Sequence, residues 1–204
     1  FGCAVSVSGN IAAIGARYDD RGTAGGAVSV FRRVGVTWTL DERLKPADGA
    51  LGDDFGTQVA VDEATETLAV GAIFHPVATP TGAVYVFTEP AATWTQQQKL
   101  VASDAASLDQ FSRSLSLRGN RLIVGAPQNE VTLFNQGAAY VFDRVGSTWT
   151  QTTRLLASDA ALDDQFGYGV ALAVDYALVG ARVDDAVATD AGSVYAYRNA
   201  GGTW

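Results

Sequence analysis

One set of sequence landmarks occurs four times in this chain, at intervals of 54 to 56 residues, and this internal repeat limits the possible folds more than any other feature. Every block carries the same landmarks in the same order: a Phe-Gly pair, a Gly-Ala pair, a hexamer that begins with Gly, and a Thr-Trp pair. The Phe-Gly pairs begin at residues 1, 55 and 166, with Phe111-Ser112 as a degenerate copy; the Gly-Ala pairs begin at 15, 71, 125 and 180; the hexamers begin at 26, 82, 137 and 192; and the tryptophans stand at 38, 94, 149 and 204.

Each block contains four strand signals. Apolar residues alternate after the Phe-Gly pair, as at Val59 and Val61, which is typical of a strand with one buried face. A Gly-Asn turn such as 119–120 favours a tight hairpin and leads into an apolar run such as 122–124. The hexamer predicts a third strand, and a fourth begins at Thr-Trp. Four antiparallel strands per unit, repeated in series, indicate the blade of a β-propeller.

The predicted fold is therefore an all-β propeller segment with blades near 1–54, 55–110, 111–165 and 166–204. The last blade stops at Trp204, where its fourth strand should begin. We expect this chain to be part of a longer, seven-bladed protein, with a closed ring of four as the alternative. A lone fragment would have open edges that favour aggregation or pairing.

Recurring glycines and aromatic residues predict how the blades pack. The glycine of each Gly-Ala pair lacks a Cβ, so we expect it to let neighbouring backbones approach closely where blades converge. The recurring phenylalanines and tryptophans are large apolar groups that would fill the wedge between blades.

In these landmarks the chain resembles the FG-GAP repeat, and Gly125-Ala126-Pro127 supplies the full second motif. The resemblance covers the whole chain. It implies the seven-bladed propeller of integrin α-subunits and of many bacterial surface or secreted proteins. It also implies an extracellular location and a role in cell adhesion, through protein or ligand binding without catalysis.

The chain departs from the integrin type in its first hairpins, which often carry a calcium loop in that family. The turns here are 8–10, 118–120 and 173–175, and the longest, 62–67, contains three carboxylates but no glycine. Calcium takes about 6–8 oxygen ligands, more than these turns supply. We therefore do not carry the family's calcium site over to this chain, and we expect no cofactor.

The composition of the chain limits the classes of partner that it can bind. A net charge of −8 and a pI near 4.5 argue against nucleic acid, which requires a basic surface. No apolar stretch approaches the roughly 18 residues of a membrane span. The chain begins without Met, and we interpret it as a fragment of a longer protein.

Few residues are candidates for catalysis. His75 is the only histidine, and we interpret it as a simple loop residue. Cys3 is the only cysteine, and we expect it to be a small buried apolar residue.

Carboxylates recur in the connectors between blades. Their simplest role is to accept backbone N–H bonds and hold the turn; a cation site and glycosidase-type acid/base chemistry are the alternatives. The pairs are Asp48 with Asp53, Asp104 with Asp109, and Asp159 with Asp164.

The loops between second and third strands have nearly constant length but unrelated composition. In a propeller they emerge on the same face as the connectors, and function on repeat scaffolds is often carried by such loops. The alternative is that no function constrains these loops and that their sequences have diverged for this reason alone. The candidate ligand-binding residues are Tyr18, Asp19, Asp20, Arg21, Phe74, His75, Gln128, Asn129, Asp184 and Asp185.

Three functions remain open. The leading hypothesis is a non-catalytic interaction or adhesion module of a secreted or cell-surface protein, with a protein or glycan ligand. The second is a carbohydrate-binding or carbohydrate-acting propeller, and the third is a structural spacer. Fold cannot decide among them, because propellers host unrelated functions.

Overall fold

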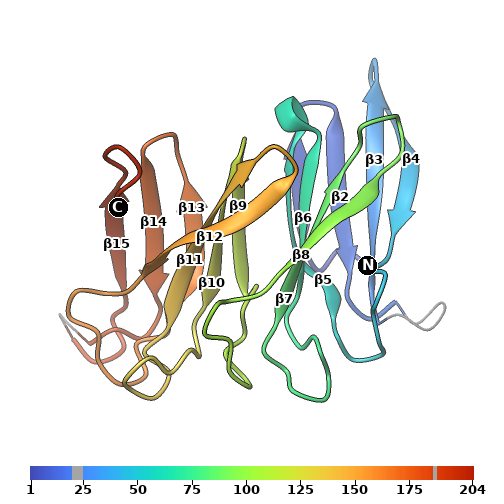
Figure 1. Cartoon of the computed structure of the whole chain (residues 1–204). Coiled ribbons are helices and arrows are strands. Elements are labelled where there is room, and N and C mark those ends of the chain that lie inside the picture. The colour runs from blue at the N-terminus through green and yellow to red at the C-terminus, as the bar shows by residue number, and fades with distance from the viewer. Residues whose placement is uncertain (20–24, 186–187) are drawn as a thin grey trace.

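The computed structural model describes residues 1–19, 25–185 and 188–204, which form four antiparallel sheets that follow one another along the chain (Figure 1). Within each sheet the strands pair in sequence order, as in a propeller blade, so the predicted fold class is confirmed. The strands are β1 (Val5–Ser8), β2 (Ile11–Ala16), β3 (Ala27–Val34) and β4 (Thr37–Leu44); β5 (Phe55–Asp62), β6 (Thr67–Ala72), β7 (Ala83–Thr88) and β8 (Thr95–Leu100); β9 (Ser114–Arg118), β10 (Arg121–Ala126), β11 (Ala138–Val145) and β12 (Thr148–Leu155); and β13 (Phe166–Leu172), β14 (Tyr176–Ala181) and β15 (Ser193–Arg198).

The fourth sheet has three strands in the part of the chain that the structure describes. After β15 the backbone makes a short turn, closed by the bridge between Ala200 and Thr203, and ends at Trp204. This agrees with the expectation that the last blade lacks its fourth strand.

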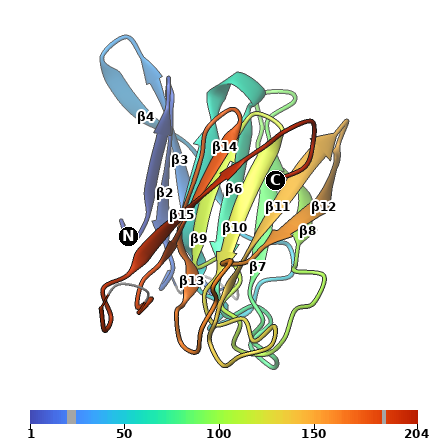
Figure 2. The same ribbon diagram turned by 90° about the vertical axis from the view of Figure 1, so that its left-hand side faces the viewer.

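The blades stand side by side and converge at their first strands. Contacts between consecutive blades join β1 to β5, β5 to β9, and β9 to β13. Seen from the side of the last blade, the strands of successive blades lie one behind another (Figure 2). The chain thus resembles a row of upright sheets whose first strands form one common inner edge.

The first hairpins follow the predicted turn chemistry in part. Gly9 and Gly119 adopt φ values of +55° and +57°, which glycine reaches without steric strain. The second blade uses a short 3₁₀ helix instead, η1 (Glu63–Thr65). Asp62 caps it by accepting from the Thr65 N–H (3.0 Å), and its other oxygen accepts from the Gly119 N–H of the next blade (2.9 Å). The carboxylate of this turn therefore joins two hairpins.

The hydrophobic core lies between the blades. Three clusters of buried side chains fill the three spaces between consecutive sheets, and each cluster draws on both flanking blades. In β10, Leu122 and Val124 face the second blade whereas Ile123 faces the fourth, because strand residues alternate sides. The predicted aromatic filling of the wedge is confirmed for five residues of the three interfaces: Phe55, Phe111, Phe166, Trp94 and Trp149.

Glycines allow the closest approach of the blades. A Cβ on Gly15 would overlap the carbonyl oxygen of Gly56, and one on Gly125 would overlap that of Gly167. The sequence prediction for the Gly-Ala pair is therefore confirmed at these two interfaces.

The end blades each leave one face uncovered. Phe1, Val5 and Val7 are exposed on the first blade, and Leu178 and Val194 are exposed on the last. Within the described part of the chain, no helix has the length and apolar content of a membrane span.

Candidate functional site

The 2–3 loops and the connectors share one end of the molecule, which we call the loop face; it is the lower end in Figure 1. Each connector is hydrogen-bonded to the preceding blade's loop. The Gly25 N–H donates to the Ala50 carbonyl (2.9 Å), the Leu108 N–H to that of Pro80 (2.7 Å), and the Asp163 N–H to that of Phe134 (2.9 Å). The prediction that the 2–3 loops and the connectors lie on the same face is therefore confirmed.

The second aspartate of each connector holds the turn through the backbone. Asp53, Asp109 and Asp164 accept hydrogen bonds from the N–H groups of Ala50 (2.7 Å), Ala106 (2.8 Å) and Ala161 (2.6 Å). This is the bonding that the sequence predicted for both aspartates.

The first aspartate of each connector has a different partner. The hydroxyl of a tyrosine on the third strand of the following blade donates to it: Tyr85 to Asp48 (2.8 Å), Tyr140 to Asp104 (2.7 Å), and Tyr195 to Asp159 (2.6 Å). Lys99 and Arg154 on the fourth strands add ion pairs to Asp48 and Asp104, each at 2.5 Å. The prediction of backbone bonding is therefore wrong for these three, because the connector folds onto the strands of the next blade.

His75 lies in its loop but is buried beneath the surface. Its Nδ1 is 2.8 Å from Asp53 Oδ2, and its ring packs edge-on against Tyr85 with centroids 5.7 Å apart. Its Nε2 is 3.4 Å from Lys99 Nζ. His75 therefore tethers the loop to the connector, which a simple loop residue would not do.

The equivalent residues of the other loops also turn inward. Asn129 and Asp184 are buried, and Asp19 is ion-paired with Arg43. Among the other candidates, Tyr18 and Asp185 are exposed, whereas Phe74 and Gln128 are half-buried; Asp20 and Arg21 lie outside the described residues.

Burial and hydrogen bonding move the carboxyl pKa values in opposite directions. Burial alone would raise the pKa of Asp48, but the hydrogen bonds from Lys99 and Tyr85 outweigh it and lower the pKa. Burial raises the pKa of Asp109 despite its bonds from Ala106 and Asn129. The ionised form of Asp109 is therefore less favourable in the folded protein than in the unfolded chain, and its charge destabilises the folded state.

We expect Asp109→Asn to stabilise the protein at neutral pH. The amide keeps an acceptor oxygen for Ala106 and Asn129 and removes a charge from a residue that is 2% exposed. When the pKa of a carboxyl group is higher in the folded than in the unfolded state, the free energy of unfolding falls as the pH rises through the folded-state pKa. The gain over wild type should therefore be absent near pH 3 and reach about 1 kcal/mol near pH 7, as measured by urea denaturation.

Asp48→Asn is the matched control, with the opposite sign expected. The lowered pKa of Asp48 means that its ionised form stabilises the fold above the ordinary carboxyl pKa. This variant should lose stability near pH 7 and not near pH 3. If Asp109→Asn were destabilised at neutral pH in the same way, the buried charge would be a favourable one.

Four carboxylates gather at the last connector and line a small cavity of about 240 Å³: Asp159, Asp164, Asp184 and Asp185. The Tyr195 hydroxyl is 2.6 Å from both Asp159 Oδ1 and Asp184 Oδ2, so it bridges connector and loop. Burial raises the pKa of Asp164; the hydrogen bond from the Ala161 N–H opposes this rise, and the negative charges of the neighbouring aspartates add to it. Among the described residues, no three His, Cys, Asp or Glu side chains are grouped so that they could hold a metal ion.

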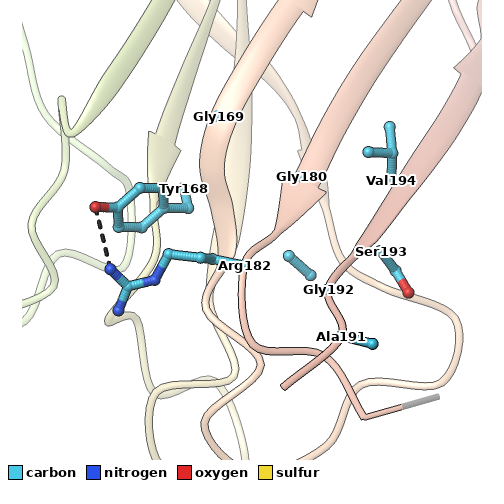
Figure 3. A pocket seen from close by; sticks show the side chains of 9 residues that line it. Tyr168, Gly169, Gly180, Arg182, Ala191, Gly192, Ser193 and Val194 are labelled. Atoms are coloured by element: carbon cyan, nitrogen blue, oxygen red, sulfur yellow. Dashed lines mark hydrogen bonds between the residues drawn. The ribbon is translucent and has the colours of Figure 1, made fainter. Parts of the chain in front are cut away.

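Arginines gather at the inner edge of the loop face. Arg113 Nη2 donates to the Tyr168 hydroxyl (2.6 Å), and Arg182 Nη1 donates to the same oxygen at 3.2 Å (Figure 3). Both guanidinium groups also lie over the Tyr168 ring, 4.2 and 4.4 Å from its centroid. Arg17, which follows the first Gly-Ala pair as Arg182 follows the last, lies over Tyr18.

Two cavities adjoin these arginines. One of about 410 Å³ lies between the first three blades, and Arg17, Arg113 and Cys3 are among its lining residues. Cys3 is exposed there rather than buried, so that prediction is wrong: the residue lies at the mouth of a cavity. The other cavity, of about 420 Å³, runs along the uncovered side of the last blade, between Tyr168, Gly180 and Gly192 (Figure 3).

The tyrosines and the arginines are the residues that the sequence prediction missed. A signal existed for the tyrosines, since the third-strand hexamers carry Tyr85, Tyr140 and Tyr195 at one position. The signal for the arginines was partial: Arg17 and Arg182 follow the Gly-Ala pair in two of the four repeats, whereas Arg113 and Tyr168 occupy the same position of two different repeats.

Comparison with known proteins bears on the fold and the family. A family model described as the FG-GAP repeat matches residues 1–31, 38–87, 94–142 and 149–197. No curated protein matches. Among solved structures, Sqt1 of Saccharomyces cerevisiae is 8% identical with a TM-score of 0.56, covering 96% of this chain and 44% of its own. An exo-β-1,3-galactanase of Phanerochaete chrysosporium with β-1,3-galactotriose is 11% identical with a TM-score of 0.51, covering 95% of this chain and 46% of its own. The chain thus spans less than half the length of either structure, and at these identities the likeness concerns the fold alone.

Proposed function

The chain belongs to the FG-GAP repeat family, and we propose that it is a non-catalytic interaction module of a secreted or cell-surface protein that binds its partner through the loop face. The observation that carries this proposal is a row of exposed apolar side chains along that face. Exposed apolar side chains gathered on one face of a protein are typical of protein interaction sites.

The row follows the boundaries between blades. The connectors contribute Leu51, Leu108 and Leu162, each more than half exposed. The 2–3 loops contribute Tyr18, Val77 and Phe134, also exposed. Because each loop is hydrogen-bonded to the following connector, every boundary presents apolar groups from both.

The layer beneath this row is polar and internally bonded. The aspartate–tyrosine bonds fix each connector to a strand of the next blade, and the aspartate–backbone bonds hold the turn within the connector itself. A rigid layer of this kind lowers the conformational entropy lost when the surface binds a partner. This favours binding of a protein surface over a purely structural spacer role.

Selection from a random peptide library displayed on phage tests the proposal, with the whole chain as bait. We expect bound peptides to lose at least about tenfold in affinity for the triple variant Leu51→Ser/Leu108→Ser/Leu162→Ser, because exposed apolar anchors at an interface each contribute on the order of 1 kcal/mol. Biolayer interferometry with synthetic peptides gives the affinities.

Val36 and Val145 provide the matched control. They are almost fully exposed on the 3–4 hairpins at the opposite end of the blades, so Val36→Ser/Val145→Ser should leave peptide binding unchanged. Peptides that bind the loop-face variant as well as wild type, or that respond to the control instead, would show that the loop face is not the binding surface.

A further inference from the structure

We infer that the cavity between the first three blades binds a carboxylate, supplied by an acidic side chain of a protein partner. The inference rests on the proposed function and names the chemistry of one contact within it. Its basis is the charge, shape and position of the 410 Å³ cavity at the inner edge of the loop face.

The cavity is built from three blades. Arg17 follows β2, Ile73 and Phe74 follow β6, Thr57 and Gln58 belong to β5, and Gln110 and Arg113 precede β9. The side chains that can hydrogen-bond are thus two guanidinium groups, two amides and a hydroxyl. Carboxylates are absent from this described lining.

Arg17 interacts electrostatically with the Asp54 carboxylate, whereas the ion pairs of the described residues do not include Arg113 or Arg182. Those ion pairs join Arg32, Arg43, Lys99, Arg121 and Arg154 to aspartate or glutamate, whereas Arg113 and Arg182 share the neutral hydroxyl of Tyr168. Two like charges within reach of one oxygen repel each other, and an anion would relieve that repulsion. A guanidinium fork held by stacking on an aromatic ring is well suited to a carboxylate.

Net charge decides between the sources of such an anion. At −8, the chain as a whole repels an extended polyanion such as a sulfated glycan. A protein partner that places one or two acidic side chains at the cavity meets only the local positive field. The amides of Gln58 and Gln110 can in addition bond to a peptide backbone.

The test titrates the whole chain with two capped peptides, Gly-Glu-Gly-Asp-Gly and its uncharged counterpart Gly-Gln-Gly-Asn-Gly, followed by NMR of the arginine Nε–Hε signals. We expect the acidic peptide to shift the Arg113 and Arg17 signals and the uncharged one to leave them in place. Arg113→Gln should weaken binding about tenfold, and Arg113→Lys, which keeps the charge but not the fork, should weaken it less.

Arg198→Gln is the matched control, since Arg198 is exposed at the other end of β15. Equal binding of both peptides, or full affinity in folded Arg113→Gln, overturns the inference. Binding of a heparin-derived hexasaccharide at these arginines without the acidic peptide also overturns it, in favour of a polyanionic glycan. If Arg113→Gln has no effect while the leucine variant no longer binds the phage-selected peptides, the anion site is contradicted and the proposed interaction module is supported. If Arg113→Gln weakens binding of the acidic peptide while the leucine variant binds its peptides normally, the apolar binding surface is contradicted and the anion site is supported.

Discussion

Replacing Gly125 with alanine is expected to destabilise the chain by at least about 3 kcal/mol, the largest effect of a single methyl group that we expect in this protein. The added Cβ would overlap the carbonyl oxygen of Gly167 and the Ser114 hydroxyl. The first obstacle is backbone of the next blade, so a side-chain rotation cannot relieve the overlap and the third and fourth blades must separate. Thermal unfolding should show a fall in Tm of about 6 °C or more.

Gly180 is the matched control because it is the same position of the last repeat. The nearest atom to a Cβ there is the carbonyl oxygen of Gly169, at 3.7 Å, since the described chain places no further blade against it. Gly180→Ala should therefore leave Tm nearly unchanged. Equal destabilisation by both substitutions would mean that the glycine serves its own strand rather than the contact between blades.

Phe111→Ala is expected to cost about 3–5 kcal/mol, as large-to-small substitutions of buried aromatic residues do. The ring is fully buried, with edge-on contacts to Tyr140 and Phe142 at centroid distances of 5.6 and 6.0 Å. The cavity would open in the core between the second and third blades. The free energy of unfolding from urea titration measures the loss.

Phe1→Ala is the matched control, because Phe1 occupies the same repeat position as Phe111 but is not buried. Phe1 is 79% exposed, so its truncation should change the free energy of unfolding by less than about 0.5 kcal/mol. A comparable loss in both variants would contradict the assignment of the aromatic landmark to packing between blades.

The fold could be predicted because each structural requirement is written several times in the sequence. The glycine that permits close approach and the aromatic residue that fills the wedge recur at the spacing of one blade, and the Gly-Asn turn occurs in the first and third blades. A local pattern that agrees with the global fold in every copy leaves few alternatives. The 3₁₀ turn of the second blade was not foreseen, because its cap, Asp62, is stabilised in part by the next blade.

The site was only partly predictable, since its contacts join distant residues. Asp109 bonds to an N–H three residues away, and short-range turn chemistry predicts this. By contrast, Asp48 and Asp53 of the connector bond to Tyr85 and His75, which belong to the following blade and lie 37 and 22 positions away in the sequence. Arg113 and Tyr168 meet across 55 positions, and no single repeat contains both.

Contacts restricted to consecutive blades also bear on how such a protein can change in evolution. The main strand contacts link each blade only to its neighbours, and each boundary repeats the last: Phe55 bridges to Gly26 as Phe166 does to Gly137. Duplication or loss of one whole unit in the gene would therefore preserve every remaining boundary, whereas an insertion of partial length would break one. Lineages of this architecture can accordingly lengthen or shorten by whole blades while point mutation diversifies their surface loops.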